Sequence, residues 1–320
     1  MTTIKKLGLT ALAGSLVATS AYAGAVDVTG GASITYKSED NDEVTGNPFS
    51  MGRGITFSGG GEMDNGWNVN MFYVMDDAAF SSSGISVDMG DGGTFYFDNG
   101  GGSTGVQSMK DKIPYAGAEQ AYDDMTGDGD GLTSFPTSGT LGWKTDVAGY
   151  TVSAAYNKNG STSTGGTATG TAYAHESSNS VAVSGVVGDG VDVGLGWANI
   201  SGTGPDKDVK AMTTYAKYAT GGATMALQYT ALDQPAGTND IDSLGYGVTF
   251  AVNDNLSVGI SMLDVDYNTA GKSDQTSVGI GASYTMGSMS VAATSATTDS
   301  ASGTSGSDDK HTEIKLSFAF

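Results

Sequence analysis

Carboxylates are the side chains of this sequence with the clearest capacity for chemistry, and three of them stand close together in one segment. Glu119 precedes Asp123 and Asp124 by four and five residues, so a helical turn over residues 116–125 would place them on roughly one face. Carboxylates gathered on one face raise the local concentration of cations. We expect these three acids to act together on cations; the alternative is that they belong to a disordered external loop.

Two further acids follow in a Gly-rich run, Asp128-Gly129-Asp130-Gly131. Ca²⁺ is a hard cation that binds carboxylate and carbonyl oxygens, so Asp128 and Asp130 are candidate calcium ligands. The run lacks the complete twelve-residue calcium loop and the Glu that ends it. A plain acidic turn is therefore the alternative, and calcium is the one metal that the sequence suggests.

Histidine and cysteine usage argues against an enzyme. The chain has no cysteine, which excludes disulfides and thiol metal sites. Its two histidines, His175 and His311, stand at the edges of polar loops, outside any Gly-x-Ser-x-Gly or comparable setting. They are also too far apart in the sequence to form a metal motif of defined spacing. We expect no catalytic residues and no obligatory cofactor, and we interpret both histidines as solvated loop residues.

The elements that must position these acids are short amphipathic strands, and the end of the chain shows the pattern most clearly. One parity of the last eight residues is apolar and the other is mostly polar. The apolar positions are Ile314, Leu316, Phe318 and Phe320, and the others are Glu313, Lys315, Ser317 and Ala319. Successive strand side chains point to opposite faces, so this segment is a strand with one apolar, aromatic-rich face.

The same alternation recurs along the chain between connections that are in turn short and long. Counting the segments gives sixteen strands of about ten residues, the length that crosses a bilayer at a tilt. The sequence predicts an all-β fold, a transmembrane antiparallel β-barrel with sixteen strands, short periplasmic turns and long extracellular loops. The longer connections are expected at residues 38–52, 76–83, 99–138, 158–178, 201–208, 233–240, 267–273 and 298–310. The third is far beyond ordinary loop length, and we expect it to fold into the barrel. Glu119, Asp123 and Asp124 would then line the constriction of a water-filled channel; the alternative is a disordered external loop.

The first 23 residues are typical of a secretory signal peptide. Lys5 and Lys6 precede an apolar stretch, residues 7–18, and Ala21-Tyr22-Ala23 matches a cleavage site. We expect a signal peptide over 1–23 and a single barrel domain over 24–320; a buried N-terminal helix is the alternative. Cleavage would change the net charge from −21 to −23 by removing two lysines. A chain of that charge is not expected to bind nucleic acid.

Few basic residues are available to face the acids across a channel. Lys37, Lys144 and Lys315 have the parity of the polar strand faces. Arg53, the only arginine, shares the parity of Ile55, so it needs the strand's outer end or a local twist to reach the lumen. These four are the candidate basic residues of the pore wall. Most other polar positions are Ser, Thr, Asn or Gly, which suits a hydrated and weakly selective channel.

The signal peptide, the sixteen amphipathic strands and the long third loop occur together with the segment Gly52-Arg53-Gly54-Ile55-Thr56-Phe57, the turn Met63-Asp64-Asn65-Gly66-Trp67 and the terminal Phe320. In this combination the chain resembles the general bacterial porins, in particular the Gly- and Asp-rich porins of alphaproteobacteria. The resemblance implies a homotrimer in the outer membrane of a Gram-negative bacterium, with one pore per chain narrowed by the third loop. It also implies that Phe318 and Phe320 are read by the machinery that inserts barrels. The enteric PEFGG-type loop motif is absent, and Pro114-Tyr115-Ala116-Gly117 is a loose counterpart.

The sequence as a whole predicts an outer-membrane channel for passive diffusion of small hydrophilic solutes and ions, with a preference for cations. A substrate-specific channel is one alternative, and it would use aromatic residues of lumen parity, for which Phe72 and Tyr218 are the candidates. A barrel-type adhesin or enzyme is another. A secreted calcium-binding solenoid is disfavoured because the nine-residue repeat that it needs is missing.

Overall fold

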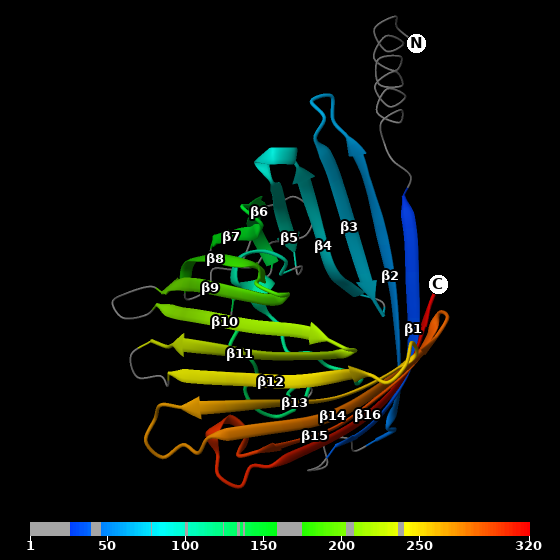
Figure 1. Cartoon of the computed structure of the whole chain (residues 1–320), viewed down its shortest axis with the longest axis vertical. Helices are drawn as coiled ribbons and strands as arrows, with labels where there is room; N and C mark the ends of the chain where they lie inside the picture. Colours follow the sequence, from blue (N-terminus) through cyan, green and yellow to red (C-terminus); the bar gives the residue numbers. More distant parts are fainter. Residues whose placement is uncertain are drawn as a thin grey trace, which may run out of the picture.

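The chain forms a closed antiparallel β-barrel of sixteen strands (Figure 1). The computed structural model describes residues 26–39, 46–77, 79–99, 102–123, 125–132, 135–136, 138–158, 175–202, 208–235 and 240–320. Each strand pairs with its neighbours in the chain, and the first strand closes the barrel on the last. The predicted fold class and strand number are thereby confirmed.

The strands of the first half are β1 (Asp27–Glu39), β2 (Phe49–Glu62), β3 (Asn68–Asp76), β4 (Ala79–Asp88), β5 (Thr94–Asn99), β6 (Ser138–Val147), β7 (Tyr150–Lys158) and β8 (His175–Val187). Those of the second half are β9 (Val191–Gly202), β10 (Val209–Thr220), β11 (Ala223–Asp233), β12 (Ile241–Ala251), β13 (Leu256–Tyr267), β14 (Gln275–Met286), β15 (Met289–Asp299) and β16 (Asp309–Ala319). Three 3₁₀ helices, η1 (Gly90–Gly92), η2 (Gly105–Met109) and η3 (Ala301–Gly303), lie in connections. None of the helices in the described residues is long and apolar enough to cross a membrane.

Short and long connections alternate around the barrel, with one exception to the predicted pattern. The second long connection was expected over residues 76–83, but β3 ends at Asp76 and β4 begins at Ala79. Asp77 has a φ of 53°, a left-handed conformation that Asp tolerates and that reverses the chain at once. Its N–H donates to the Arg53 carbonyl at 2.7 Å. The serines at 81–83 are therefore part of a strand.

The two faces of the wall differ as the sequence alternation predicted. Along β14, Ile280 is 58% exposed on the outer face, whereas Ser277 is fully buried on the inner face. Along β9, Leu195 is likewise exposed outside, and Ala198 is buried inside. A continuous outer surface of exposed apolar side chains is unfavourable in water and suits a barrel surrounded by lipid.

The barrel closes at a seam between β1 and β16 that includes the last residue of the chain. The Phe320 N–H donates to the Gly30 carbonyl at 2.9 Å, and the Gly30 N–H donates to the Phe320 carbonyl at 2.7 Å. The Phe320 ring lies over Gly30, where a Cβ would come within 2.8 Å of Cε2. Phe318 and Phe320 both remain exposed on the outer surface. Both are therefore accessible to a partner outside the barrel.

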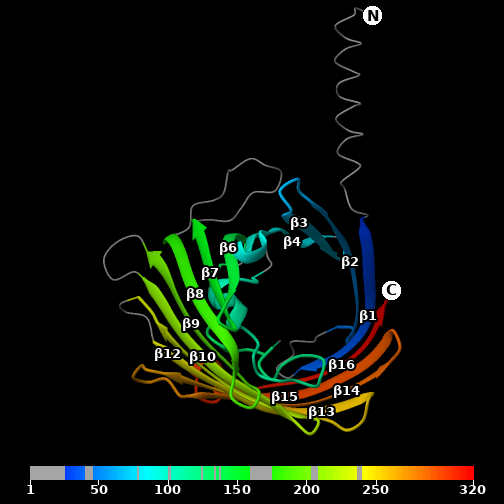
Figure 2. The ribbon, with the colours of Figure 1, turned by 45° about the horizontal axis from the view of Figure 1, so that its top comes forward.

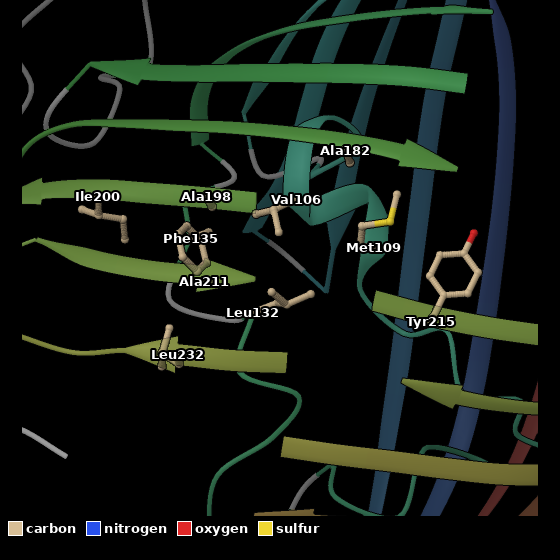
Figure 3. Close-up of a cluster of buried hydrophobic side chains, with 10 residues drawn as sticks. All are labelled: Val106, Met109, Leu132, Phe135, Ala182, Ala198, Ile200, Ala211, Tyr215 and Leu232. Carbon is tan, nitrogen blue, oxygen red and sulfur yellow. The ribbon is translucent and has the colours of Figure 1, made fainter. Parts of the chain in front are cut away.

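The third long connection joins β5 to β6, and its described residues fold into the barrel (Figure 2). Its first anchor is an apolar cluster against the inner wall (Figure 3). From the loop come Val106, Met109, Leu132 and Phe135, and from β8–β11 come Ala182, Ala198, Ile200, Ala211, Tyr215 and Leu232. The Gln107 side chain joins the two ends of the loop by donating to the Leu132 and Phe135 carbonyls, each at 2.8 Å.

Glycines of the inner wall give the loop backbone room to lie close to the strands. A Cβ on Gly281 would come within 2.6 Å of the Gly117 nitrogen, and one on Gly279 within 2.7 Å of the Ala121 Cβ. A Cβ on Gly247 would similarly come within 2.8 Å of Ile113. Glycine in a strand interior often marks a close approach of another backbone. The loop and the wall are thus fitted to one another at the level of the main chain.

Replacing Gly281 with Val should push the loop away from β14. Overpacking of this kind typically costs about 1–3 kcal/mol. The amides of Ala118 and Glu119, which donate to Thr294 Oγ1 at 2.9 and 3.3 Å, should then exchange hydrogen faster. Ser283→Val, two residues along the same face, is the matched control and should leave their exchange unchanged. Equal exchange rates in Gly281→Val and the parent protein would contradict the close fit.

Candidate functional site

The candidate site is the part of the lumen that the inward loop narrows, and two buried glutamines hold the loop backbone there. The Gln228 side chain accepts from the Lys112 N–H at 3.2 Å and donates to the Met109 carbonyl at 2.8 Å. The Gln275 side chain likewise accepts from the Asp128 N–H at 3.0 Å and donates to the Asp128 carbonyl at 2.8 Å. Each amide therefore replaces a β-sheet partner for a loop that has no strand of its own.

Hydroxyl and carboxylate side chains of the wall bind the rest of the loop. The Gly105 N–H donates to Ser153 Oγ at 2.8 Å, and the Thr126 N–H donates to Asp309 Oδ2 at 2.7 Å. Tyr115 and Thr294 also share a short hydroxyl–hydroxyl contact. Burial is the main reason that the pKa of Tyr115 rises to about 12, so its hydroxyl stays protonated at neutral pH. The loop is thus fixed along its length.

Glu119 and Asp123, two of the three acids predicted to share one face, point to different places in the structure. Residues 121–123 form a turn rather than part of a helix, and the loop's one 3₁₀ helix in the described residues is η2. Glu119 points at the wall, with its Oε1 2.6 Å from His311 Nε2. Asp123 is exposed in the lumen, and Asp124 lies outside the described residues. The physical reason is that residues 121–123 are not helical and that the contact with His311 of the wall sets the direction of Glu119.

Asp111 is a lumen acid that the sequence reading missed, and it lies next to Asp123. The Gln120 side chain donates to Asp111 Oδ1 at 3.4 Å, while the Gln120 N–H points at Asp123 Oδ2, also at 3.4 Å. Partial burial raises the pKa of Asp123, the Gln120 N–H opposes this, and repulsion from Asp111 adds to it. Asp111 stands between Lys110 and Lys112 in the sequence, so the segment has a net positive charge and did not indicate an acidic site.

Three of the four predicted basic residues face the lumen. Lys37 Nζ lies 3.6 Å from Glu313 Oε2, and Lys315 is half-buried on the same face of β16 as Glu313. Lys144 Nζ lies 5.6 Å from the centre of the Tyr96 ring, a cation–π contact. Neighbouring side chains therefore place Lys37 and Lys144 against the wall.

Arg53 is not brought to the lumen wall. It shares the parity of Met51 and Ile55, both of which are exposed on the outer face. Its guanidinium lies 3.7 Å from Asp77 Oδ1, and both side chains are more than half exposed. The local twist that would have turned Arg53 inward is absent from this strand, because β2 pairs in unbroken register with β1.

Two further lysines belong to the lumen and were missed. Lys112 of the loop lies 5.2 Å from the centre of the Tyr215 ring, whose hydroxyl donates to Asp192 Oδ1 at 3.0 Å. Burial lowers the pKa of Lys112, Asp192 opposes this, and the charge of Lys217 adds to it. Lys217 has the inward parity of Tyr215 on β10. Tyr218, by contrast, stands opposite Met225, which is exposed outside, so Tyr218 does not have the lumen parity expected for it.

A cavity of 340 Å³ lies on the β2–β5 side of the lumen. Its inner lining includes Phe72, Tyr96 and the polar side chains of Asn70, Ser86, Asp98 and Ser103. The Ser103 hydroxyl donates to Asp98 Oδ2 at 2.8 Å, which joins the start of the loop to β5. Phe72 therefore has the lumen parity that the sequence predicted.

The candidate calcium ligands, Asp128 and Asp130, are held in separate contacts. Asp128 Oδ2 accepts from the Tyr267 hydroxyl at 2.6 Å, and Asp130 Oδ1 accepts from the Leu132 N–H at 3.0 Å. Burial raises the pKa of Asp130. Neither residue belongs to the one group of three or more metal-binding side chains found among the described residues. A calcium ion at this turn stays a prediction.

His311 is buried rather than solvated, which corrects the sequence-based interpretation. Its side chain is 1% exposed and lies between Glu119 of the loop, Glu313 of β16 and Glu39 of β1. We call these four residues the His311 cluster. The sequence placed His311 at the start of a strand but gave no sign that the third loop would cover it. His175 is in β8, and its side chain is outside the described residues.

The Gram-negative porin family matches residues 8–304. Comparison with curated proteins finds no match. Among solved structures, a porin refined at 1.8 Å has a TM-score of 0.71 at 18% identity and covers 92% of this chain and 100% of its own.

Two further structures are similar to the chain. An anion-selective porin from Comamonas acidovorans has a TM-score of 0.67 at 16% identity, covering 93% of this chain and 100% of its own. The outer-membrane protein OmpT of Vibrio cholerae has a TM-score of 0.61 at 16% identity, covering 93% and 98%. At these identities the structural matches support the barrel fold alone, and the family match supports membership.

Leu132→Ala should loosen the inward loop without unfolding the barrel. Leu132 is fully buried in the apolar cluster, and removing a buried Leu side chain typically costs about 2–5 kcal/mol. We expect the free energy of local opening, measured by hydrogen exchange over residues 102–132, to fall by a similar amount. Leu195→Ala, on the outer face of β9, is the control. An unchanged opening free energy in Leu132→Ala would show that the polar contacts alone hold the loop.

Proposed function

We propose that this chain, which belongs to the Gram-negative porin family, prefers cations among the small hydrophilic solutes and ions that diffuse through its channel. As a porin it is an outer-membrane channel and has no enzymatic activity. The observation that carries the proposed preference is the pair of lumen acids, Asp111 and Asp123, on the inward loop. Selection by charge at a constriction needs no covalent chemistry.

The environment of the charged groups supports this preference. Lys37 lies next to Glu313, and Lys112 lies against Tyr215 close to Asp192, so carboxylates offset both lysines. Asp111 has Lys110 at 4.0 Å, but both side chains are exposed, and such a pair is weak in water. The chain as a whole has a net charge of −21. A passing cation would therefore meet an excess of negative potential.

The resemblance to general porins extends this proposal to assembly and export. We propose that residues 1–23, which lie outside the described residues, are removed as a signal peptide, and that the mature barrel forms a homotrimer. The short turns would face the periplasm, and Phe318 and Phe320 would guide insertion. N-terminal sequencing of the purified protein and its native mass test cleavage and assembly. A mature chain that retains residue 1, or a monomeric mass, would contradict the respective proposal.

A substrate-specific channel is the second candidate, and the 340 Å³ cavity favours it. Phe72 and Tyr96 supply aromatic faces there, beside the Asp98 carboxylate. A general pore would show a solute permeability that falls smoothly with size. A specific channel would show saturation by one class of solute, and Phe72→Ser would abolish that saturation.

The cation preference is tested in planar bilayers by the reversal potential under a salt gradient. The parent channel should give a potential of cation-selective sign, and the double variant Asp111→Asn with Asp123→Asn should move it toward zero, because two lumen charges are lost. The control is Asp189→Asn with Asp254→Asn, which removes two charges from exposed short turns. An anion-selective parent channel, as one structural relative is described, would overturn the preference while leaving the pore intact.

The preference should also depend on pH in a way that Asp123 explains. The pKa of Asp123 is raised, so its carboxylate is protonated at a higher pH than an ordinary Asp, whose pKa is about 3.9. As pH falls, the reversal potential should begin to shrink above that value. Asp123→Asn should remove this early phase, since no proton is then taken up at position 123. An identical pH profile in both proteins would exclude Asp123 from the selectivity.

A further inference from the structure

We propose that Glu119, His311 and Glu313 form a binding site for a divalent transition metal of the Zn²⁺ class, which fastens the inward loop to β16. Within the residues that the structure describes, these three are the one group of three or more His, Asp or Glu side chains whose ligand atoms all lie within 4.8 Å of one another. The inference is independent of the proposed ion preference, because it concerns the attachment of the loop.

The strand and the loop supply the ligands with a suitable geometry. His311 and Glu313 are two residues apart on β16, so both side chains point to the lumen face. His311 Nε2 lies 2.6 Å from Glu119 Oε1 and 3.7 Å from Glu313 Oε2. Ligands of a tetrahedral zinc ion at about 2.1 Å lie about 3.4 Å from one another, between these two distances. A fourth position would remain for water.

The second nitrogen of the imidazole, Nδ1, has a carboxylate partner, as the non-ligating nitrogen of a metal-binding histidine usually does. His311 Nδ1 lies 3.2 Å from Glu39 Oε1, and Glu39 stands directly opposite His311 in the β1–β16 pairing. A carboxylate in this position accepts the Nδ1 proton and leaves the Nε2 lone pair for a metal. In that tautomer, Nε2 would face two carboxylates, an arrangement that is repulsive unless a cation or a proton lies between them.

Burial makes the polar atoms of this site costly to leave without a partner. The side chains of His311 and Glu313 are 1% and 3% exposed, and that of Glu119 is 17% exposed. His311 Nε2 and Glu119 Oε1 are both fully buried, and neither makes an aligned hydrogen bond despite their short separation. Unsatisfied buried groups of this kind cost free energy that a bound metal ion would recover.

The charge balance leaves room for a cation at the site. The His311 cluster contains three carboxylates; Lys37 Nζ lies 3.6 Å from Glu313 Oε2, and the charge of Lys315 also acts on Glu313. With a neutral imidazole the cluster keeps an excess negative charge in a buried place, and a buried charge needs a partner of opposite sign. A cation bound by Nε2 and the two carboxylates would supply that partner.

The type of ligand narrows the metal. One imidazole and two carboxylates match the nitrogen and oxygen ligands of Zn²⁺, whereas Ca²⁺ and Mg²⁺ prefer oxygen ligands alone. The loop ligand is held in position before binding, since the Glu119 N–H donates to the Tyr115 hydroxyl at 3.0 Å and to Thr294 Oγ1 at 3.3 Å. Binding would therefore need little movement of the main chain.

Calorimetric titration of the folded, untagged protein with ZnCl₂, after treatment with a chelator, tests the site. We expect one Zn²⁺ per chain, unaffected by an excess of Ca²⁺. Glu119→Gln should weaken binding at least tenfold, and Glu39→Gln, which alters only the partner of the imidazole, should weaken it by about 10–100-fold. His175→Gln and Asp123→Asn are the controls and should bind as the parent protein does.

A second measurement reports on the loop itself and needs no substitution of the buried His311. Zn²⁺ should slow hydrogen exchange at the Ala118 and Glu119 amides in the parent protein and in Asp123→Asn, but not in Glu119→Gln. Absence of stoichiometric binding, or binding that Glu119→Gln and Glu39→Gln leave unchanged, would overturn the proposed site. Loss of binding in His175→Gln would place the metal elsewhere and overturn it as well.

Discussion

The pairing of β1 with β16 is the interaction on which the rest of the structure depends. In a lipid environment each backbone N–H and C=O needs a partner within the protein, and an open sheet would leave two edges without one. The chain closes these edges along the full seam, down to the two hydrogen bonds between Gly30 and Phe320. The same seam brings Glu39 opposite His311. Closure of the barrel therefore also builds the wall to which the inward loop attaches.

The inward loop is stable because the wall is shaped for it. A loop of this length loses much conformational entropy when it is ordered, so its contacts must be extensive. Its ends bury an apolar cluster against the inner wall, and its middle lies on strands whose inner positions include glycines. Gln228 and Gln275 then supply backbone partners that a strand would have supplied. The small inner residues and the amide side chains of β8–β15 thus both hold the loop against the wall.

The regular part of this architecture could be predicted from the sequence, because a period of two is a local property of the chain. Strand number, closure and the outward direction of residues such as Ile280 follow from it. The loop's path could not be predicted, since it depends on contacts between segments more than a hundred residues apart. The pairs Gly281–Gly117 and His311–Glu119 are of this kind. Inner glycines that alternate with outer apolar residues, as around Ile280, were the signal that was available.

For the charges of the lumen, too, the local sequence pattern sets the position and distant contacts set the effect. Parity alone places Lys37, Lys144 and Lys315 inside, but their effect on a passing ion depends on what each one contacts. A lysine beside a carboxylate or over an aromatic ring adds less to the field than its formal charge suggests. A carboxylate on the exposed rim of the loop, such as that of Asp123, retains contact with water and ions. Selectivity in this barrel is therefore governed by which charges the loop leaves facing water, more than by the number of charges on the wall.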